Sequence, residues 1–133
     1  MSLFNSIFGG SRKAEKSTVK KSDFEWLALQ DLTQIETIKK ESITNPVIIF
    51  KHSTRCGISK MVIKKFEKLF TEAHKNYKVY YLDLLNYREI SNELASAFQV
   101  VHQSPQVLVI KNGTSVFTTS HEAIADMDLN TFI

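Results

Sequence analysis

The residues best suited to chemistry lie in the stretch KHSTRCGISK, which runs from Lys51 to Lys60. It contains Cys56, the only cysteine in the 133-residue chain, and three positions later, where a second cysteine often follows, it has Ser59. One cysteine cannot form an intramolecular disulfide, so nothing indicates a secreted, disulfide-stapled scaffold. The chemistry left to a single thiol is exchange with a disulfide made by a small thiol, followed by regeneration through a second thiol or a reductase.

Cys56 is expected at the first turn of a helix, because the apolar run Val47–Phe50 precedes it and an amphipathic pattern follows it. Unpaired backbone N–H groups and the helix dipole favour a thiolate there, and Lys51, Arg55 and Lys60 would act in the same direction. A pKa lowered from about 8.5 to about 6.5 would make the thiolate the majority form at neutral pH. It would also make the thiol a good leaving group. The alternative is an inert buried cysteine, but the small and polar neighbours favour a reactive one.

Two further residues are candidates for the site. Ser59 either hydrogen-bonds the thiolate or is simply a polar residue in the first helical turn. Pro105 lies in QSPQ, immediately before an expected strand, where a proline is common without special meaning. A cis bond between Ser104 and Pro105 would instead bring backbone close to the thiol, and cis bonds are largely confined to X-Pro.

Hydrophobic periodicity predicts the order of helices and strands. Strands are expected at Phe24–Leu29, Val47–Phe50, Lys78–Asp83, Gln106–Ile110 and Thr114–Thr119. A capping box from Thr33 to Glu36 opens the first helix. The helix after the cysteine is expected to bury a stripe made of Ile58, Met61, Val62, Phe66, Leu69 and Phe70.

The remaining signals lie in the second half of the chain. Ile90, Leu94, Ala97 and Phe98 mark a third helix. An Asn-Gly turn at Asn112 predicts an antiparallel hairpin between the last two strands. Asp128 is a candidate cap for a short helical stub that ends the chain.

The order β-α-β-α-β-α-β-β predicts an α/β fold, in which flanking helices cover a mixed central sheet that ends in a C-terminal β-hairpin. Such a sheet binds ligands beyond the carboxyl ends of its parallel strands, and Cys56 follows one of these ends. We expect one domain over residues 23–133, preceded by an N-terminal arm, residues 1–22, that is loose and polar-flanked.

Composition narrows the classes of function. The chain is 43% hydrophobic and 23% charged, as expected of a folded protein. Its formal net charge of +3 comes from lysines and arginines scattered along the sequence, which argues against nucleic-acid binding. No apolar run is long enough for a signal peptide or a membrane span. We therefore expect a cytoplasmic protein without nucleic-acid or membrane partners.

A strand, Cys-x-x-Ser at a helix start and a proline before a terminal hairpin together resemble the thioredoxin fold. More specifically, the segments KHSTRCGIS, VYYLDL, ISNELASAFQVVHQSPQVLVIKNG and TSH are similar to the YtxJ-type monothiol bacilliredoxin family. The resemblance covers roughly Phe24 to Leu129.

The resemblance implies a cytosolic bacterial protein in which Cys56 attacks mixed disulfides between proteins and bacillithiol and becomes bacillithiolated itself. Bacillithiol is then a thiol co-substrate, and neither a tightly bound cofactor nor a metal is expected. The partners would be bacillithiolated proteins and a redoxin or reductase that regenerates the thiol.

The resemblance also suggests roles for other residues. Pro105, after Ser104, matches the family's cis-proline position, and we expect Pro105 and Ser59 to serve catalysis with Cys56. Substrate contacts are expected from His52, Thr54, Arg55, Gly57 and Ser104. Because bacillithiol carries carboxylates, a positive site would suit it, for which the candidates are Lys51, Arg55 and Lys60. Two further family histidines are matched by His102 and His121.

Gly57 departs from the family, which commonly has proline there, and the resulting CGIS approaches the CGFS of monothiol glutaredoxins that carry iron–sulfur clusters. A cluster would need two chains, because each supplies one thiolate. The glycine-rich stretch that follows the last strand of glutaredoxins is replaced here by FTTSHEAIAD. An iron–sulfur carrier and a non-catalytic thioredoxin-like adaptor therefore remain the alternatives to the exchange enzyme.

Overall fold

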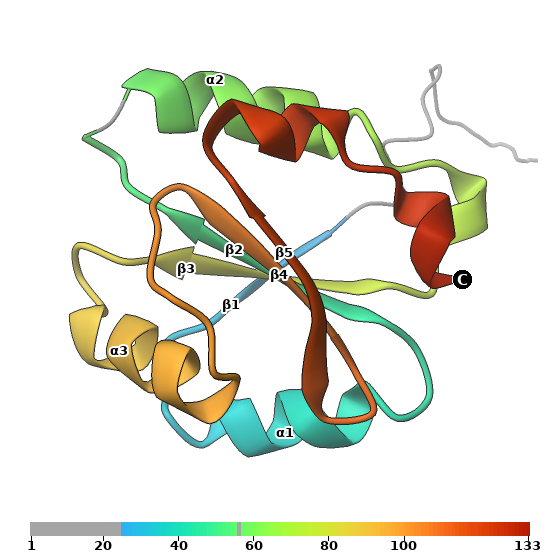
Figure 1. The fold of residues 1–133 in the computed structure, drawn as a ribbon, viewed down its shortest axis with the longest axis horizontal. Coiled ribbons are helices and arrows are strands. Elements are labelled where there is room, and N and C mark those ends of the chain that lie inside the picture. The colour runs from blue at the N-terminus through green and yellow to red at the C-terminus, as the bar shows by residue number, and fades with distance from the viewer. Residues whose placement is uncertain (1–24, 56) are drawn as a thin grey trace, which may run out of the picture.

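The computed structural model describes residues 25–55 and 57–133, in which helices and strands alternate along most of the chain (Figure 1). The predicted arm, residues 1–22, lies outside the described residues. The strands are β1 (Trp26–Ala28), β2 (Val47–His52), β3 (Lys78–Asp83), β4 (Gln106–Lys111) and β5 (Thr114–Ser120). The α-helices are α1 (Gln34–Glu41), α2 (Gly57–Glu67) and α3 (Arg88–Ala97), and the 3-10 helices are η2 (Glu72–His74), η3 (His121–Asp126) and η4 (Leu129–Phe132).

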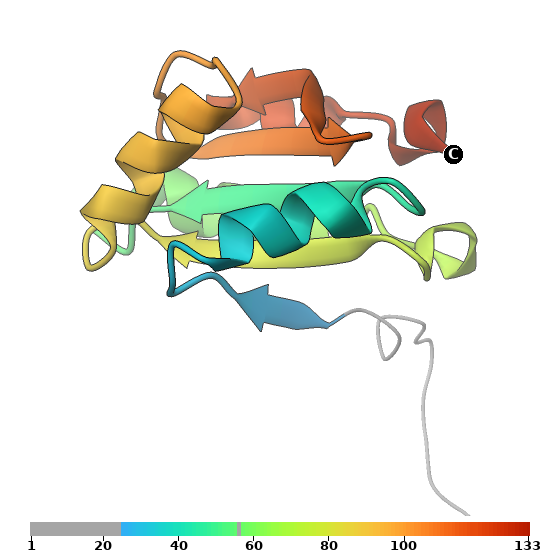
Figure 2. The same ribbon diagram turned by 90° about the horizontal axis from the view of Figure 1, so that it is seen from below.

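The five strands form one mixed sheet in the order β1-β3-β2-β4-β5 (Figure 2). β1, β3 and β2 are parallel, whereas β4 is antiparallel to both β2 and β5. Asn112 and Gly113 connect β4 to β5 with φ angles of 54° and 79°, as a two-residue hairpin turn requires. The predicted α/β class, mixed sheet and C-terminal hairpin are therefore confirmed.

Helices cover both faces of the sheet. α1 and α3 lie on one face, and α2 lies on the other with η3 and η4 (Figure 1). Every residue of β2 is buried, because the strand is central and has a helix layer on each side. The core on the α1 and α3 face includes Ile49, Leu82, Leu94 and Leu108. The core on the other face includes Phe50, Val62, Phe66 and Ile124. No helix in the described part of the chain is long and apolar enough to span a membrane.

The start of α1 differs from the prediction. The side chain of Thr33 does not cap the helix. Instead, the Asp31 carboxylate accepts hydrogen bonds from Thr33 N at 2.8 Å and Thr33 Oγ1 at 2.7 Å. Gln34 Oε1 in turn accepts from Asp31 N at 2.9 Å. The reciprocal cap thus runs from Asp31 to Gln34, and a carboxylate replaces the predicted threonine as the capping group.

The apolar stripe of α2 is narrower than predicted. Its buried residues are Ser59, Val62 and Phe66, spaced by three and four positions as on one face of a helix. Ile58 and Met61 remain 40% and 49% exposed, so their expected place in the core was wrong. The stripe contains a serine because its hydroxyl has a partner on β2.

At the end of the chain the predicted stub is η4. The Asp128 side chain accepts a hydrogen bond from Asn130 N at 3.0 Å, which confirms the predicted cap. η3 was not predicted; it packs beside α2 and completes that helix layer.

Candidate active site

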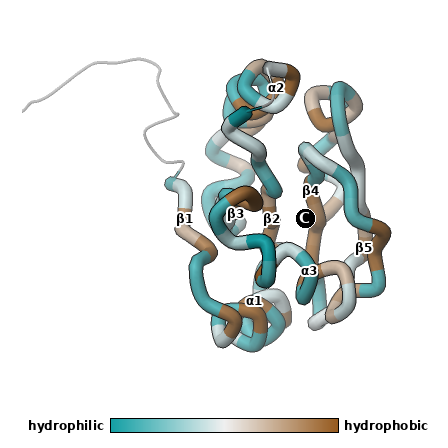
Figure 3. The backbone as a smooth tube through the Cα atoms, turned by 90° about the vertical axis from the view of Figure 1, so that its left-hand side faces the viewer, coloured by the Kyte–Doolittle hydropathy of each residue, from teal (hydrophilic) through white to brown (hydrophobic). Residues whose placement is uncertain are grey.

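The loops that carry the predicted site residues meet at the end of the sheet where β2 and β3 finish and α2 and α3 begin. Figure 3 looks onto this end, with α2 and α3 on opposite sides of the strands. Cys56 itself lies outside the described residues, so its role stays a prediction. Its neighbours in the chain are Arg55, an exposed turn residue, and Gly57, the exposed first residue of α2.

Ser59 and His52 form the most closely packed polar pair of this region. Ser59 Oγ lies 2.6 Å from His52 Nδ1 and accepts a hydrogen bond from Ser53 N at 3.3 Å. Ser59 is fully buried and His52 is 5% exposed. The pair ties the first turn of α2 to the end of β2, on the sheet face that α2 covers. The sequence alternatives for Ser59 were a hydrogen bond to the thiolate or a simple polar place in the first helical turn. Its partners among the described residues are His52 and Ser53, and a bond to the thiolate stays a prediction.

His52 lies between groups of opposite charge. Burial lowers the pKa of the His52 imidazole. The Asp83 carboxylate raises this pKa, and the Lys60 ammonium lowers it. Asp83 is the residue opposite His52 in the parallel register of β2 and β3. Its Oδ2 accepts a hydrogen bond from Asn86 Nδ2 at 2.7 Å, whereas its buried Oδ1 has no partner among the described residues. Because burial depresses its pKa, His52 is neutral at pH 7.

Asp83 is a site residue that the sequence analysis did not select. Its only sequence signal was its position at the end of KVYYLD, a predicted parallel strand. Strand order was needed to show that β3 lies next to β2, so that Asp83 comes beside His52. The Tyr81 ring also contacts the imidazole, with 5.4 Å between ring centroids.

The loop before β4 carries Ser104 and Pro105, and the bond between them is cis. Pro105 is buried, and its carbonyl oxygen accepts a hydrogen bond from His121 N at 3.0 Å. Ser104 is half-buried, and neither of its backbone groups has a hydrogen-bond partner in residues 25–55 and 57–133. Of this pair, Ser104 therefore offers the open backbone groups.

The three candidates for a positive site, Lys51, Arg55 and Lys60, differ in their exposure to solvent. Arg55 and Lys60 are exposed, as is Thr54 before them. Lys51 is fully buried, so it does not belong to a solvent-facing patch as expected. Its Nζ lies 2.7 Å from His102 Nδ1 on the face that α1 and α3 cover. The change of face follows from strand geometry, because Lys51 and His52 are consecutive residues of β2 and point to opposite sides.

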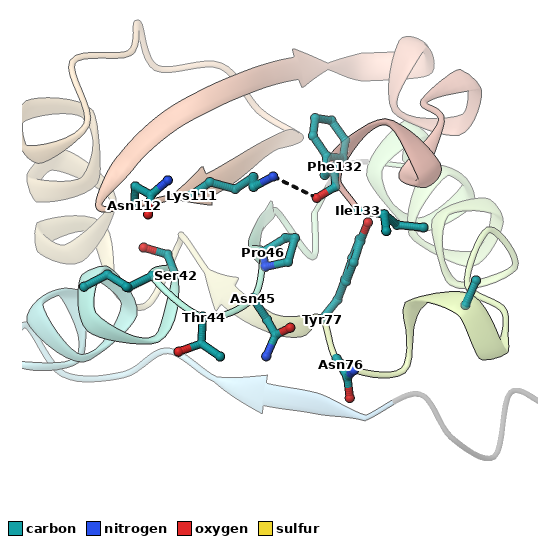
Figure 4. A pocket seen from close by; sticks show the side chains of 12 residues that line it. Ser42, Thr44, Asn45, Pro46, Asn76, Tyr77, Lys111, Asn112, Phe132 and Ile133 are labelled. Atoms are coloured by element: carbon teal, nitrogen blue, oxygen red, sulfur yellow. Dashed lines mark hydrogen bonds between the residues drawn. The ribbon is translucent and has the colours of Figure 1, made fainter.

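A separate pocket lies at the other end of the sheet, where β2 begins and β4 ends (Figure 4). It has a volume of about 200 Å³ and is lined by Pro46, Tyr77 and Lys111 among others. Figure 4 shows the Lys111 ammonium donating to Phe132 O, a contact of 3.0 Å. No predicted site residue lines this pocket. In the described part of the chain, no three His, Cys, Asp or Glu side chains converge as a metal would require.

Comparisons with known proteins agree with this geometry. The family described as monothiol bacilliredoxin BrxC matches residues 27–129. A solved structure of a candidate oxidoreductase with a thioredoxin fold is 29% identical, with a TM-score of 0.65 over 74% of this chain and 85% of that chain. Reduced thioredoxin pre-protein from Schistosoma mansoni is 21% identical, with a TM-score of 0.65 over 83% and 100% of the two chains. Thioredoxin from Malassezia sympodialis is 22% identical, with a TM-score of 0.61 over 74% and 81%. The thioredoxin fold is thereby confirmed, and the family match and the first structure support a thiol–disulfide redox role.

Proposed function

The chain belongs to the monothiol bacilliredoxin family, and from this premise we propose that it removes bacillithiol from protein mixed disulfides in the cytoplasm. Cys56 is the nucleophile, and the acceptor is a disulfide between a protein thiol and bacillithiol. Ser59 and Pro105 are the residues that we expect to support catalysis by Cys56. The candidates for substrate contact are Arg55, Thr54, Ser104 and Gly57.

The reaction consists of two exchanges. In the first, the Cys56 thiolate attacks the bacillithiol sulfur of the mixed disulfide, a new S–S bond forms, and the protein thiolate leaves and takes a proton. In the second, an external thiolate attacks the bacillithiol sulfur on Cys56 and expels the Cys56 thiolate. The external thiol is bacillithiol itself or a redoxin or reductase cysteine, and each exchange conserves the number of disulfide bonds.

One observation carries the single-thiol mechanism. Ser59, at the position of a resolving cysteine, is fully buried and lies 2.6 Å from His52 Nδ1. A serine cannot form the second S–S bond that would release a substrate internally, and its hydroxyl here is engaged with the protein. Release of bacillithiol from Cys56 therefore needs a thiol from outside the chain.

The cis-proline loop supports the binding of an extended protein substrate. Ser104 N–H and C=O are unpaired in the described part of the chain, and they precede a cis proline that stands immediately before β4. Backbone groups in this arrangement can take an added strand of substrate. Binding through backbone would let the enzyme accept proteins of different sequence.

The experiment is intact-mass analysis of the reduced protein after brief exposure to a bacillithiolated model protein. We expect rapid transfer of bacillithiol to Cys56, release of the free substrate thiol, and no transfer to Cys56→Ser. A glutathionylated form of the same model protein serves as the matched substrate. It should transfer glutathione to Cys56 only slowly. Absence of transfer from both substrates would refute the exchange reaction, and equal rates would refute the preference for bacillithiol.

A further inference from the structure

The contact between Lys51 and His102 is a short polar interaction of the site region that the exchange reaction does not use. Lys51 is fully buried on β2, and His102 is an exposed residue of the loop that leads to Pro105. Their side-chain nitrogens lie 2.7 Å apart. A buried ammonium is normally paired with a carboxylate, yet this one contacts an imidazole.

Among the described residues, the charges that shift the pKa of His102 are positive. Burial lowers the pKa of Lys51 to about 8, and no carboxylate in residues 25–55 and 57–133 raises it. The pKa of His102 is lowered first by burial and then by Lys51 and Arg88. At pH 7 Lys51 is therefore mostly protonated, whereas His102 is neutral.

These protonation states determine which ring nitrogen of His102 carries the proton. An ammonium has only donors, so Lys51 donates to His102 Nδ1, and the imidazole proton lies on Nε2. Nε2 has no hydrogen-bond partner in the described part of the chain. In this part of the chain, His102 thus presents an unpaired Nε2–H donor. The buried Lys51 ammonium at Nδ1 polarises this donor.

Arg88 lies on the side of α3 that faces His102, whose pKa its charge lowers. Ser91 Oγ is 3.5 Å from His102 Nδ1, so the α3 face that carries Ser91 is turned toward His102. Arg88 is three residues earlier and shares that face. Its guanidinium is exposed and makes no hydrogen bond or ion pair with other described residues. Figure 1 shows α3 running beside the loop that leads to β4.

We propose that His102 and Arg88, with Lys51 behind His102, form an anion subsite that binds the carboxylates of the thiol carried by the substrate. The inference rests on the proposed function for the identity of that thiol, and it names residues other than the exposed Arg55 and Lys60. His102 supplies a neutral N–H donor, and Arg88 supplies a charged fork suited to a carboxylate. Lys51 is a positioning residue, because it holds the tautomer of His102 and does not reach the ligand.

The first test compares two mixed disulfides of the same protein, one with bacillithiol and one with bacillithiol whose carboxylates are methyl esters. We expect kcat/KM of the wild-type protein to be about tenfold higher for the carboxylate form, as one charged hydrogen bond implies. The double variant Arg88→Gln/His102→Gln should bring the two values within about twofold of each other. Lys64→Gln, which removes an exposed charge from α2, should keep the wild-type ratio. An unchanged ratio in the double variant would overturn the subsite.

The second test does not depend on exchange activity. Citrate is added to Cys56→Ser protein at constant ionic strength while the imidazole NMR signals of His102 and His121 are followed. We expect a saturable shift at His102, weakened by Arg88→Gln, and no saturable shift at His121. Equal shifts at both histidines would overturn the subsite. If neither disulfide exchanges in the first test, the proposed function fails by itself, and the citrate titration still decides whether the subsite exists.

Discussion

Ser59 Oγ and His52 Nδ1, 2.6 Å apart, join the first turn of α2 to the end of the central strand β2. Both residues are buried, so water does not replace the contact if it is lost. The same hydroxyl accepts from Ser53 N, which draws the β2–α2 loop toward the helix. Ser59, three positions after Cys56 in the sequence, is thus part of the structural support that joins β2 to α2.

Ser59→Ala should lower the free energy of unfolding by about 1–3 kcal/mol, because it leaves a buried imidazole nitrogen without its partner. Urea unfolding monitored by the fluorescence of Trp26 measures the change. Ser91→Ala is the matched control, since Ser91 is also a buried helical serine but lies 3.5 Å from His102 Nδ1. A loss no larger than that of Ser91→Ala would contradict the importance of the contact with His52.

Charges on both sides of His52 should move its pKa in opposite directions. Asp83→Asn removes the carboxylate that raises this pKa and should lower it, whereas Lys60→Gln removes a lowering charge and should raise it. Imidazole NMR titration of the folded protein gives both values, and His121 serves as an internal reference. Movement of the His52 pKa in the same direction in both variants would show that the two charges do not act as described.

Lys51 should make stability rise with pH above about 8. Burial lowers the pKa of Lys51 from the ordinary lysine value of 10.5 to about 8 in the folded protein. Between these values the unfolded chain binds more protons, so the free energy of unfolding increases with pH, by at most about 1.4 kcal/mol per unit. Below pH 8 both states are protonated and the cost of burying the charge is fully present.

Lys51→Met removes this titration. The difference in unfolding free energy between Lys51→Met and wild type should be largest below pH 8 and should shrink toward pH 10.5. All other titrating groups are common to both proteins and cancel in the difference. Lys64→Met, at an exposed position, should show no such change with pH. A pH-independent difference for Lys51→Met would rule out a lowered pKa at Lys51.

Gly57 and Gly113 should respond oppositely to alanine. A Cβ added at either position meets nothing within 4 Å, so backbone conformation alone separates them. Gly57→Ala at the start of α2 should stabilise the fold by about 0.4–1 kcal/mol. Gly113→Ala, at a φ of 79°, should destabilise it by about 1–2 kcal/mol. Thermal unfolding compares the two variants, and stabilisation by both would contradict the assigned turn geometry.

Local patterns were sufficient for most of the fold. The apolar run at Val47–Phe50 predicted a strand buried on both faces, because only a central strand can hide every side chain. The Asn-Gly pair predicted the hairpin, because these residues accept the positive φ angles that the turn needs. Residue identity alone limited the chemistry, since one cysteine with Ser59 three positions later excludes a disulfide within the chain.

Contacts between distant segments were decided by tertiary structure. Lys51 follows Phe50 in sequence as an ordinary charged residue, and only the placement of β2 between β3 and β4 buries it against His102. Asp83 comes beside His52 through strand register, which no local pattern encodes. The sequence by itself thus determined which elements form and which thiol is available. The packing of strands and helices decided which polar side chains meet at the end of the sheet, because burial and strand order are properties of the whole chain.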